Sequence, residues 1–171
     1  MLQFDIDVKT GIRLREVTLN DAPMIYRAIA DHRDYLKTWL PFIANLSEQD
    51  EMDLSQVLSF PEEERNFTFV IECRGEFCGL VGFVNSDFVN HRTEIGYWLL
   101  PEYQRQGIMT RSVRTLCRWA VEARLMHRIQ IRCAVKNYSS NAIPRRLGFR
   151  LEGTERDGEL MFSGEYVDTN V

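Results

Sequence analysis

The sequence predicts an α/β (α+β) fold in which a central, mostly antiparallel sheet is flanked by helices. Three observations support this prediction. An apolar segment closed by Pro101 is followed, after a short turn, by apolar residues at helical spacing. Two apolar segments at 67–73 and 77–84 flank a turn at Gly75, which is typical of a β-hairpin. Alternating apolar and polar residues at 128–135 predict a half-buried strand.

The elements can be placed in order from the same patterns. A strand at 12–17 is expected first, and helices at 19–30 and 35–58 follow it. After the hairpin, the sheet continues through a strand at 93–100. The apolar positions after the turn predict a helix; they are Met109, Val113, Leu116, Cys117, Ala120 and Ala123. After the alternating strand come a short helix that ends at Gly148 and an antiparallel pair at 149–160 and 166–171.

Pro144 belongs to the short helix that Gly148 ends. It lies early in the predicted helix, where it either occupies a free first turn or distorts the helix.

Composition favours one domain that spans residues 1–171. A chain of 171 residues, 44% of them hydrophobic, can bury one ordinary core. No apolar run approaches the roughly 18 residues of a membrane span, and the N-terminus lacks the pattern of a signal peptide. We therefore expect a cytoplasmic protein. Cysteines and histidines fit no zinc spacing, so we expect reduced thiols and no metal; the cysteines are Cys73, Cys78, Cys117 and Cys133.

The net charge of −4 conceals two regions of opposite sign. Residues 104–150 contain many arginines and the single acidic residue Glu122. In 48–64, by contrast, every charged residue is acidic. The first region suits a polyanionic cofactor and the second a cationic amine. Three arginines form one polar stripe on the predicted helix, where we expect them to be solvated; they are Arg111, Arg114 and Arg118. Arg105 alone is favoured as a phosphate neighbour.

The turn before this helix is Gln104-Arg105-Gln106-Gly107-Ile108-Met109-Thr110. The first N–H groups of a helix have no partner within it, and the helix dipole adds positive charge there. Such a turn can bind a pyrophosphate. Alternatively, Gly107 only eases a tight turn and its neighbours are solvated. The spacing matches neither a P-loop nor G-x-G-x-x-G, so the sequence does not favour a mononucleotide- or dinucleotide-binding fold.

Residues 94–153 resemble the GNAT superfamily of acetyl-CoA-dependent N-acetyltransferases, most closely the branch that acetylates N-terminal alanine or serine of ribosomal proteins. The segments that carry this resemblance are Glu94-Ile95-Gly96-Tyr97-Trp98-Leu99, Gln104-x-x-Gly107-Ile108-Met109-Thr110, Asn137-x-x-Ser140, and Arg146-Leu147-Gly148-Phe149 with Leu151-Glu152-Gly153. The superfamily turn usually reads Q/R-x-x-G-x-G/A, and Met109 departs from it as the ribosomal branch commonly does. The resemblance implies a twisted, mixed central sheet and direct attack of a primary amine on acetyl-CoA.

The resemblance also implies which residues hold acetyl-CoA. Residues 104–110 would bind the diphosphate. Trp98, Leu99 and Leu100 would pair with the pantetheine arm, where their strand splays from its parallel neighbour at 129–135. A bulge in this backbone would donate an N–H to the thioester oxygen. Alternatively, this segment is an ordinary core strand, for which the same sequence would be expected. Asn137 is expected to contact the pantetheine region, although a turn or helix-capping role also explains it.

Two catalytic roles follow from the resemblance. Ser140 would assist the departing thiolate, a role that many members give to a later tyrosine absent here; Tyr138 is the alternative donor. A base is required because the amine arrives largely protonated. Glu159 matches the position of a catalytic glutamate in the ribosomal branch. A water chain or the lesser candidate Glu94 could accept the proton instead. Alternatively, Glu159 is only one acid of an exposed hairpin; the hairpin acids are Glu155, Asp157, Glu159 and Glu165.

Acceptor choice is expected to depend on the N-terminal helices. Tyr35, Trp39 and Phe42 cluster near acidic residues and would wall a slot for a peptide N-terminus, although such clusters are also typical of cores and interfaces. The preferred acceptor is a ribosomal-protein N-terminus. Alternatives are a polyamine, aminoglycoside or amino-acid-like acceptor, a non-catalytic acyl-CoA-binding module, and an RNA-binding protein. The negative net charge of the chain weighs against direct nucleic-acid binding. The resemblance also implies a homodimer.

Overall fold

The computed structural model describes residues 1–41, 61 and 64–171. These residues form two compact units. The first unit consists of Met1–Val17, Asn66–Arg132 and Arg146–Gly148, and the second takes up the rest. No helix in the described ranges combines the length and the hydropathy that crossing a membrane requires.

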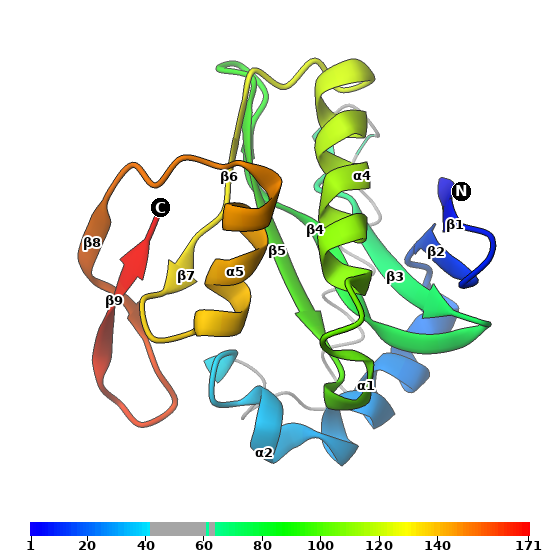
Figure 1. Ribbon diagram of the computed structural model, residues 1–171, viewed down its shortest axis with the longest axis horizontal. Helices are drawn as coiled ribbons and strands as arrows, with labels where there is room; N and C mark the ends of the chain where they lie inside the picture. Colours follow the sequence, from blue (N-terminus) through cyan, green and yellow to red (C-terminus); the bar gives the residue numbers. More distant parts are fainter. Residues whose placement is uncertain (42–60, 62–63) are drawn as a thin grey trace. The chain divides into compact units, whose positions relative to one another are not determined.

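The first unit contains a six-stranded sheet with the spatial order β1-β2-β3-β4-β5-β6 (Figure 1). Successive strands from β1 to β5 run antiparallel, whereas β6 runs parallel to β5. The strands are β1 (Gln3–Asp7), β2 (Ile12–Glu16), β3 (Thr68–Cys73), β4 (Glu76–Asp87), β5 (Arg92–Leu99) and β6 (Arg128–Gln130). This arrangement confirms the predicted mixed, mostly antiparallel sheet.

Helix α4 (Ile108–Glu122) packs against this sheet through an aromatic cluster. The Trp119 ring lies 5.1 Å from Phe67 and 5.9 Å from Phe69, centroid to centroid. It also contacts Phe4 of β1 at 5.7 Å and Phe83 of β4 at 5.8 Å. Edge and offset contacts of this kind stabilise a core beyond the area that they bury. The predicted helix is therefore confirmed, and the core fixes its position on the sheet.

Strand β1, which forms an edge of the sheet, was not among the predicted elements. Residues 3–7 alternate polar and apolar side chains, which is the pattern of a half-buried strand. Phe4 provides the apolar anchor, since its ring contacts Trp119 and Phe69. The alternating pattern that indicates this strand covers only residues 3–7.

The prediction of one strand at 128–135 is wrong. Arg128–Gln130 forms β6 of the six-stranded sheet, whereas Cys133–Ala134 forms β7 of a separate three-stranded sheet. Cys133 and Ala134 are both buried, so the alternation stops there. Their backbones pair with β9 instead.

The second unit contains the three-stranded sheet β7-β9-β8 and several helices. Its remaining elements are η1 (Leu19–Asp21), α1 (Ala22–Asp31), α2 (Arg33–Leu36), α5 (Tyr138–Leu147) up to Arg145, β8 (Thr154–Leu160) and β9 (Tyr166–Asn170). Strands β8 and β9 confirm the predicted antiparallel pair.

The first predicted N-terminal helix is divided into η1 and α1, and the second can be compared only as far as Pro41. The helix placed at 19–30 begins with η1, because the Asp21 carboxylate accepts hydrogen bonds from the Thr18 N–H and hydroxyl at 2.7 and 2.9 Å. α2 ends at Leu36, and most of the helix predicted at 35–58 lies outside the described residues.

Pro144 stands inside α5, beyond its first turn, so the first-turn alternative for this residue is wrong. Gly148 follows the helix with φ +80, as a helix-ending glycine does.

Candidate functional site

Within the first unit, β5 extends beyond its ladder with β6, which itself ends at Gln130. The parallel ladder consists of three pairs and stops at Glu94↔Gln130. The antiparallel ladder on the other side of β5 continues to Gly79↔Leu99. In this unit, residues 95–99 therefore lie beyond the ladder with β6 and pair with β4. The expected separation of this strand from a neighbour at 129–135 stays a prediction, because residues 133–135 belong to the second unit.

The expected bulge is in a neighbouring strand. Trp98 and Leu99 pair regularly with Leu80 and Gly79, whereas the register shift lies between β3 and β4, at Cys78. A Cβ on Gly79 would lie 2.2 Å from the Trp98 carbonyl oxygen. The glycine therefore allows the backbones of β4 and β5 to approach closely beside the bulge.

The turn at 104–110 leaves backbone donors open. Gly107 precedes α4 with φ +71, a conformation that favours glycine, and has no side chain to cap the helix. The first backbone bond of α4 runs from the Arg111 N–H to the Gly107 carbonyl at 3.1 Å. In the part of the chain that the structure describes, the N–H groups of residues 108–110 have no hydrogen-bond partner. With the helix dipole, they can receive an anion.

The side chains of the turn keep this backbone accessible. Ile108 and Met109 are buried in the core at 2% and 6% exposure, whereas Arg105, Gln106 and Gly107 are exposed. The Gln106 amide donates to the Glu102 carbonyl at 3.0 Å, beside the turn.

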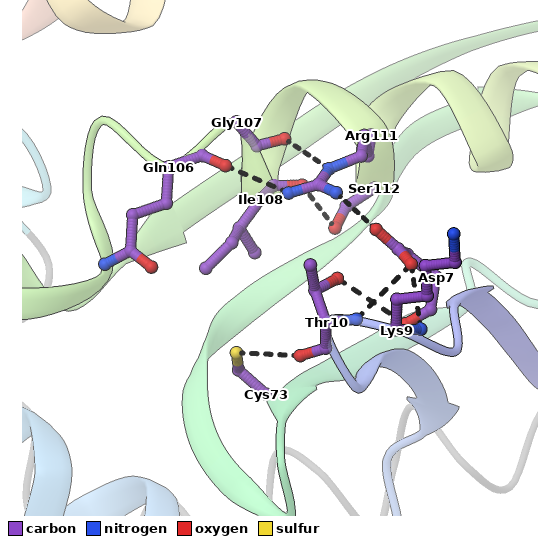
Figure 2. Close-up of polar contacts among 9 residues, drawn as sticks. All are labelled: Asp7, Lys9, Thr10, Cys73, Gln106, Gly107, Ile108, Arg111 and Ser112. Carbon is purple, nitrogen blue, oxygen red and sulfur yellow. Dashed lines mark hydrogen bonds and ion pairs between the residues drawn. The ribbon is translucent and has the colours of Figure 1, made fainter.

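The prediction that Arg111 is solvated is wrong. Figure 2 shows its guanidinium between the turn and Asp7. Its Nη1 lies 2.8 Å from the Asp7 carboxylate, its Nη2 donates to the Gln106 carbonyl at 2.9 Å, and its Nε donates to the Gly107 carbonyl at 3.3 Å. Asp7 is 104 residues away, so helical spacing gave no signal of it. Arg114 and Arg118 are exposed, as predicted.

In the second unit, Asn137 caps the start of α5. Its side-chain oxygen accepts hydrogen bonds from the Ser140 N–H at 3.2 Å and from the Ser139 hydroxyl at 3.1 Å. This is the capping role that the sequence left open. Ser140 itself is half-buried, and the alternative donor Tyr138 is 79% exposed.

Asn141 is a buried polar residue whose importance the sequence did not reveal. Its amide donates to the Ala134 carbonyl at 2.9 Å and to the Asn137 carbonyl at 2.7 Å. Its side-chain oxygen accepts from the Asn170 amide at 2.9 Å. These bonds join the start of α5 to β7 and β9. No local pattern in the sequence separates Asn141 from the polar residues next to it.

Glu159 lies in a more enclosed place than its acidic neighbours. It is half-buried in β8, opposite Val167, whereas Glu155, Asp157 and Glu165 are exposed. The β8–β9 ladder shifts register between residues 155 and 159. Next to Glu159, a Cβ on Gly158 would lie 2.1 Å from the Thr169 hydroxyl. The strand is therefore distorted just before Glu159.

The candidates for acceptor binding are only partly described. Tyr35, in α2, is 39% exposed and Trp39 is half-buried. Phe42 and nearly all of the acidic segment lie outside the described residues.

Thiol and metal chemistry receive no support from the described residues. Within ranges 1–41, 61 and 64–171, no group of three His, Cys, Asp or Glu side chains could hold a metal. Within the described residues, none of the four cysteines forms a disulfide. Burial raises the pKa of the Cys78 thiol to about 12 and that of Cys117 to about 11, so neither is a thiolate nucleophile at neutral pH.

Comparisons with known proteins cover most of the chain. Residues 12–150 match the model of an acetyltransferase (GNAT) domain. The chain is 34% identical over 171 residues to the putative ribosomal N-acetyltransferase YdaF of Bacillus subtilis (strain 168), with 96% of this chain and 91% of the relative covered. It is 29% identical to the ribosomal-protein-serine acetyltransferase of Escherichia coli (strain K12), with 97% and 93% covered.

A solved structure gives the same result. The structure of RimL, a ribosomal L7/L12 alpha-N-protein acetyltransferase in complex with coenzyme A, superposes with a TM-score of 0.87 at 27% identity. The similarity covers 96% of this chain and 94% of RimL.

Proposed function

The chain belongs to the GNAT acetyltransferase family, and on this basis we propose that it transfers acetyl from acetyl-CoA to the N-terminal α-amine of a ribosomal protein. The relatives named for ribosomal-protein acetylation support this acceptor. The coenzyme A in the RimL structure supports the cofactor. The single observation that carries the proposal is the start of α4, where three backbone N–H groups remain open beside Gly107.

These N–H groups are proposed to hold the diphosphate of acetyl-CoA. Open amides at a helix start attract negative charge and provide directional donors. Arg105 is exposed beside them and adds a cation. Gln104, Gln106 and residues 107–110 supply the remainder of this turn.

Trp98, Leu99 and Leu100 are proposed to follow the pantetheine arm. The ladder between β5 and β6 ends before these residues, at Glu94. A strand that is paired on one side can hydrogen-bond an extended ligand along its other edge, as a further strand would. Asn137 is proposed to contact the same arm, in addition to capping α5.

For the chemical step, Glu159 is proposed as the base and Ser140 as the donor to the leaving group. Glu159 accepts a proton from the ammonium group, and the free amine attacks the thioester carbonyl. The new C–N bond forms and the C–S bond breaks. The amide nitrogen loses its second proton, and the departing thiolate receives a proton through the Ser140 hydroxyl, so that CoA leaves as the thiol. The half-buried position of Glu159, unlike its exposed neighbours, supports this assignment.

Tyr35, Trp39 and Phe42 are proposed to contact the acceptor peptide. We further propose that both compact units belong to one cytoplasmic acetyltransferase domain that forms a homodimer. The family match supports the single domain, because residues 12–150 include parts of both units.

A thiol-release assay tests the function. The purified chain is incubated with acetyl-CoA and with peptides that begin with serine or alanine, and mass spectrometry locates the acetyl group. We expect CoA release and an acetylated peptide terminus. Spermidine and an aminoglycoside serve as competing acceptors. Faster acetylation of these amines would overturn the protein acceptor, and CoA binding without thiol release would overturn catalysis.

Replacement of Glu159 by Gln tests the base. General-base catalysis contributes about 100-fold or more, so the rate at neutral pH should fall by about 100-fold while CoA affinity stays constant. Glu165→Gln, at an exposed position in the same hairpin region, is the matched control. An unchanged rate in Glu159→Gln would remove this residue from the mechanism.

A further inference from the structure

The Arg111 side chain joins the start of α4 to the connection between β1 and β2 (Figure 2). All three guanidinium nitrogens are engaged. Nη2 and Nε donate to the carbonyl oxygens of Gln106 and Gly107, at 2.9 and 3.3 Å. Nη1 pairs with the Asp7 carboxylate at 2.8 Å. The side chain therefore contacts two successive peptide groups of the open turn.

These two contacts determine where the turn's N–H groups point. In a trans peptide plane, the carbonyl and the N–H of the same unit point in opposite directions. The Gln106 carbonyl shares its plane with the Gly107 N–H, and the Gly107 carbonyl shares its plane with the Ile108 N–H. Because Arg111 holds both carbonyls on one side, both N–H groups are directed to the other. A planar fork suits this task, whereas a lysine ammonium does not.

Asp7 is held in turn by the β1–β2 connection. Its carboxylate accepts from the backbone N–H groups of Lys9 at 3.0 Å and Thr10 at 3.3 Å. The Thr10 carbonyl lies 3.8 Å from the Cys73 sulfur of β3, so the connection is tied to the sheet. Hydrogen bonding from Thr10 is the main cause that keeps the pKa of Asp7 below its ordinary value, and the Arg111 charge adds to it. The carboxylate is therefore ionised at neutral pH.

We propose that Arg111 is a positioning residue for the cofactor's diphosphate, and that Asp7 holds it in place. This inference rests on the proposed function. Arg111 acts through the backbone of the turn, since each of its three guanidinium nitrogens already contacts Asp7 or one of the two carbonyls. The competing model is that Arg111 binds the phosphate directly.

Three variants separate these models. Arg111→Met removes the fork, Asp7→Asn removes its anchor with little change in size, and Arg114→Met is the matched control because Arg114 is exposed on the same helix. For each, calorimetry gives the Kd for CoA. Kinetics give kcat/KM with acetyl-CoA and with acetyl-pantetheine, which has the reactive thioester but no diphosphate.

We expect Arg111→Met to weaken CoA binding about tenfold, which corresponds to about 1.4 kcal/mol. Asp7→Asn should weaken it in the same direction, and Arg111→Lys should recover only part of the loss. The value of kcat/KM with acetyl-pantetheine should not change in any of these variants. Arg114→Met should behave like the wild-type chain in all assays.

Distinct results would overturn the inference. Tighter or unchanged CoA binding in Asp7→Asn would favour direct phosphate binding by Arg111. An equal loss with acetyl-pantetheine would indicate general damage to the fold. If Arg111→Met does not fold, Asp7→Asn and Arg111→Lys still decide between the models. Failure of the wild-type chain to bind CoA would instead contradict the proposed function.

Discussion

Helices α4 and α5 begin in opposite ways. α4 starts after Gly107, which has no side chain, and the N–H groups of residues 108–110 have no partner within the described ranges. α5 starts after Asn137, whose side-chain oxygen accepts from the Ser140 N–H at 3.2 Å. The first start is open to a ligand, and the second is closed by the protein itself.

This difference shows how a fold can keep a helix start open without losing its shape. Arg111 holds the carbonyl groups of the turn before α4 and leaves its N–H groups accessible. At α5, the buried Asn141 holds a carbonyl on each side of the connection to β7. Side chains support the backbone at both helix starts. Only at α5 does a side chain, that of Asn137, accept a hydrogen bond from an N–H group of the first turn.

The largest expected effect comes from closing the open start. Thr110→Glu places a carboxylate in the first turn of α4, where it can bond the backbone and repel a diphosphate. Two unit charges 4 Å apart near a protein surface interact by about 4 kcal/mol, so we expect about a thousandfold weaker CoA binding. Calorimetry measures this. Thr110→Gln, of the same length without the charge, should lose far less, and equal losses would argue against an anion at this site.

A second test concerns the closed start. Asn141→Ala leaves the buried groups around α5 without their partners, which costs about 2 kcal/mol of unfolding free energy. Urea unfolding followed by circular dichroism measures the loss. An unchanged midpoint would show that Asn141 does not hold the closed start.

A smaller loss is expected from Asn137→Ala, because removing a helix cap costs about 1 kcal/mol. Asn137→Asp retains an acceptor oxygen and should restore most of that stability. The same urea experiment compares the two variants. Equal destabilisation by alanine and aspartate would contradict the capping role.

The smallest effect is a pH dependence near the open start. The pKa of Asp7 is lowered below 3.8 in the folded protein, so its ionised form stabilises the fold above that pH. This contribution is lost as the pH falls through the lowered pKa. Thermal unfolding of the wild-type chain and Asp7→Asn should therefore differ at neutral pH and converge in acid. A difference that persists unchanged at pH 2 would contradict this origin.

The sequence predicted the strand, turn and helix around residue 107 because hydrophobic periodicity, Pro101 and Gly107 are local signals. The sequence did not predict contacts between residues that lie far apart in the chain. Arg111 reads as part of a solvated stripe until Asp7, 104 residues away, is brought beside it. Likewise, nothing in the alternation at 128–135 indicates that the strand leaves one sheet at Gln130 and joins another at Cys133. Local patterns specify elements, whereas long-range pairing specifies which side chains support the candidate site.

NMR of the uniformly ¹⁵N-labelled chain tests the central claim most directly. CoA and pantetheine, which lacks the diphosphate, are titrated separately while the backbone amide resonances are followed. We predict that the amide of Gly107 and those of residues 108–110 shift strongly with CoA and remain in place with pantetheine. Saturable CoA binding that leaves these amide resonances unmoved would contradict a diphosphate site at the start of α4.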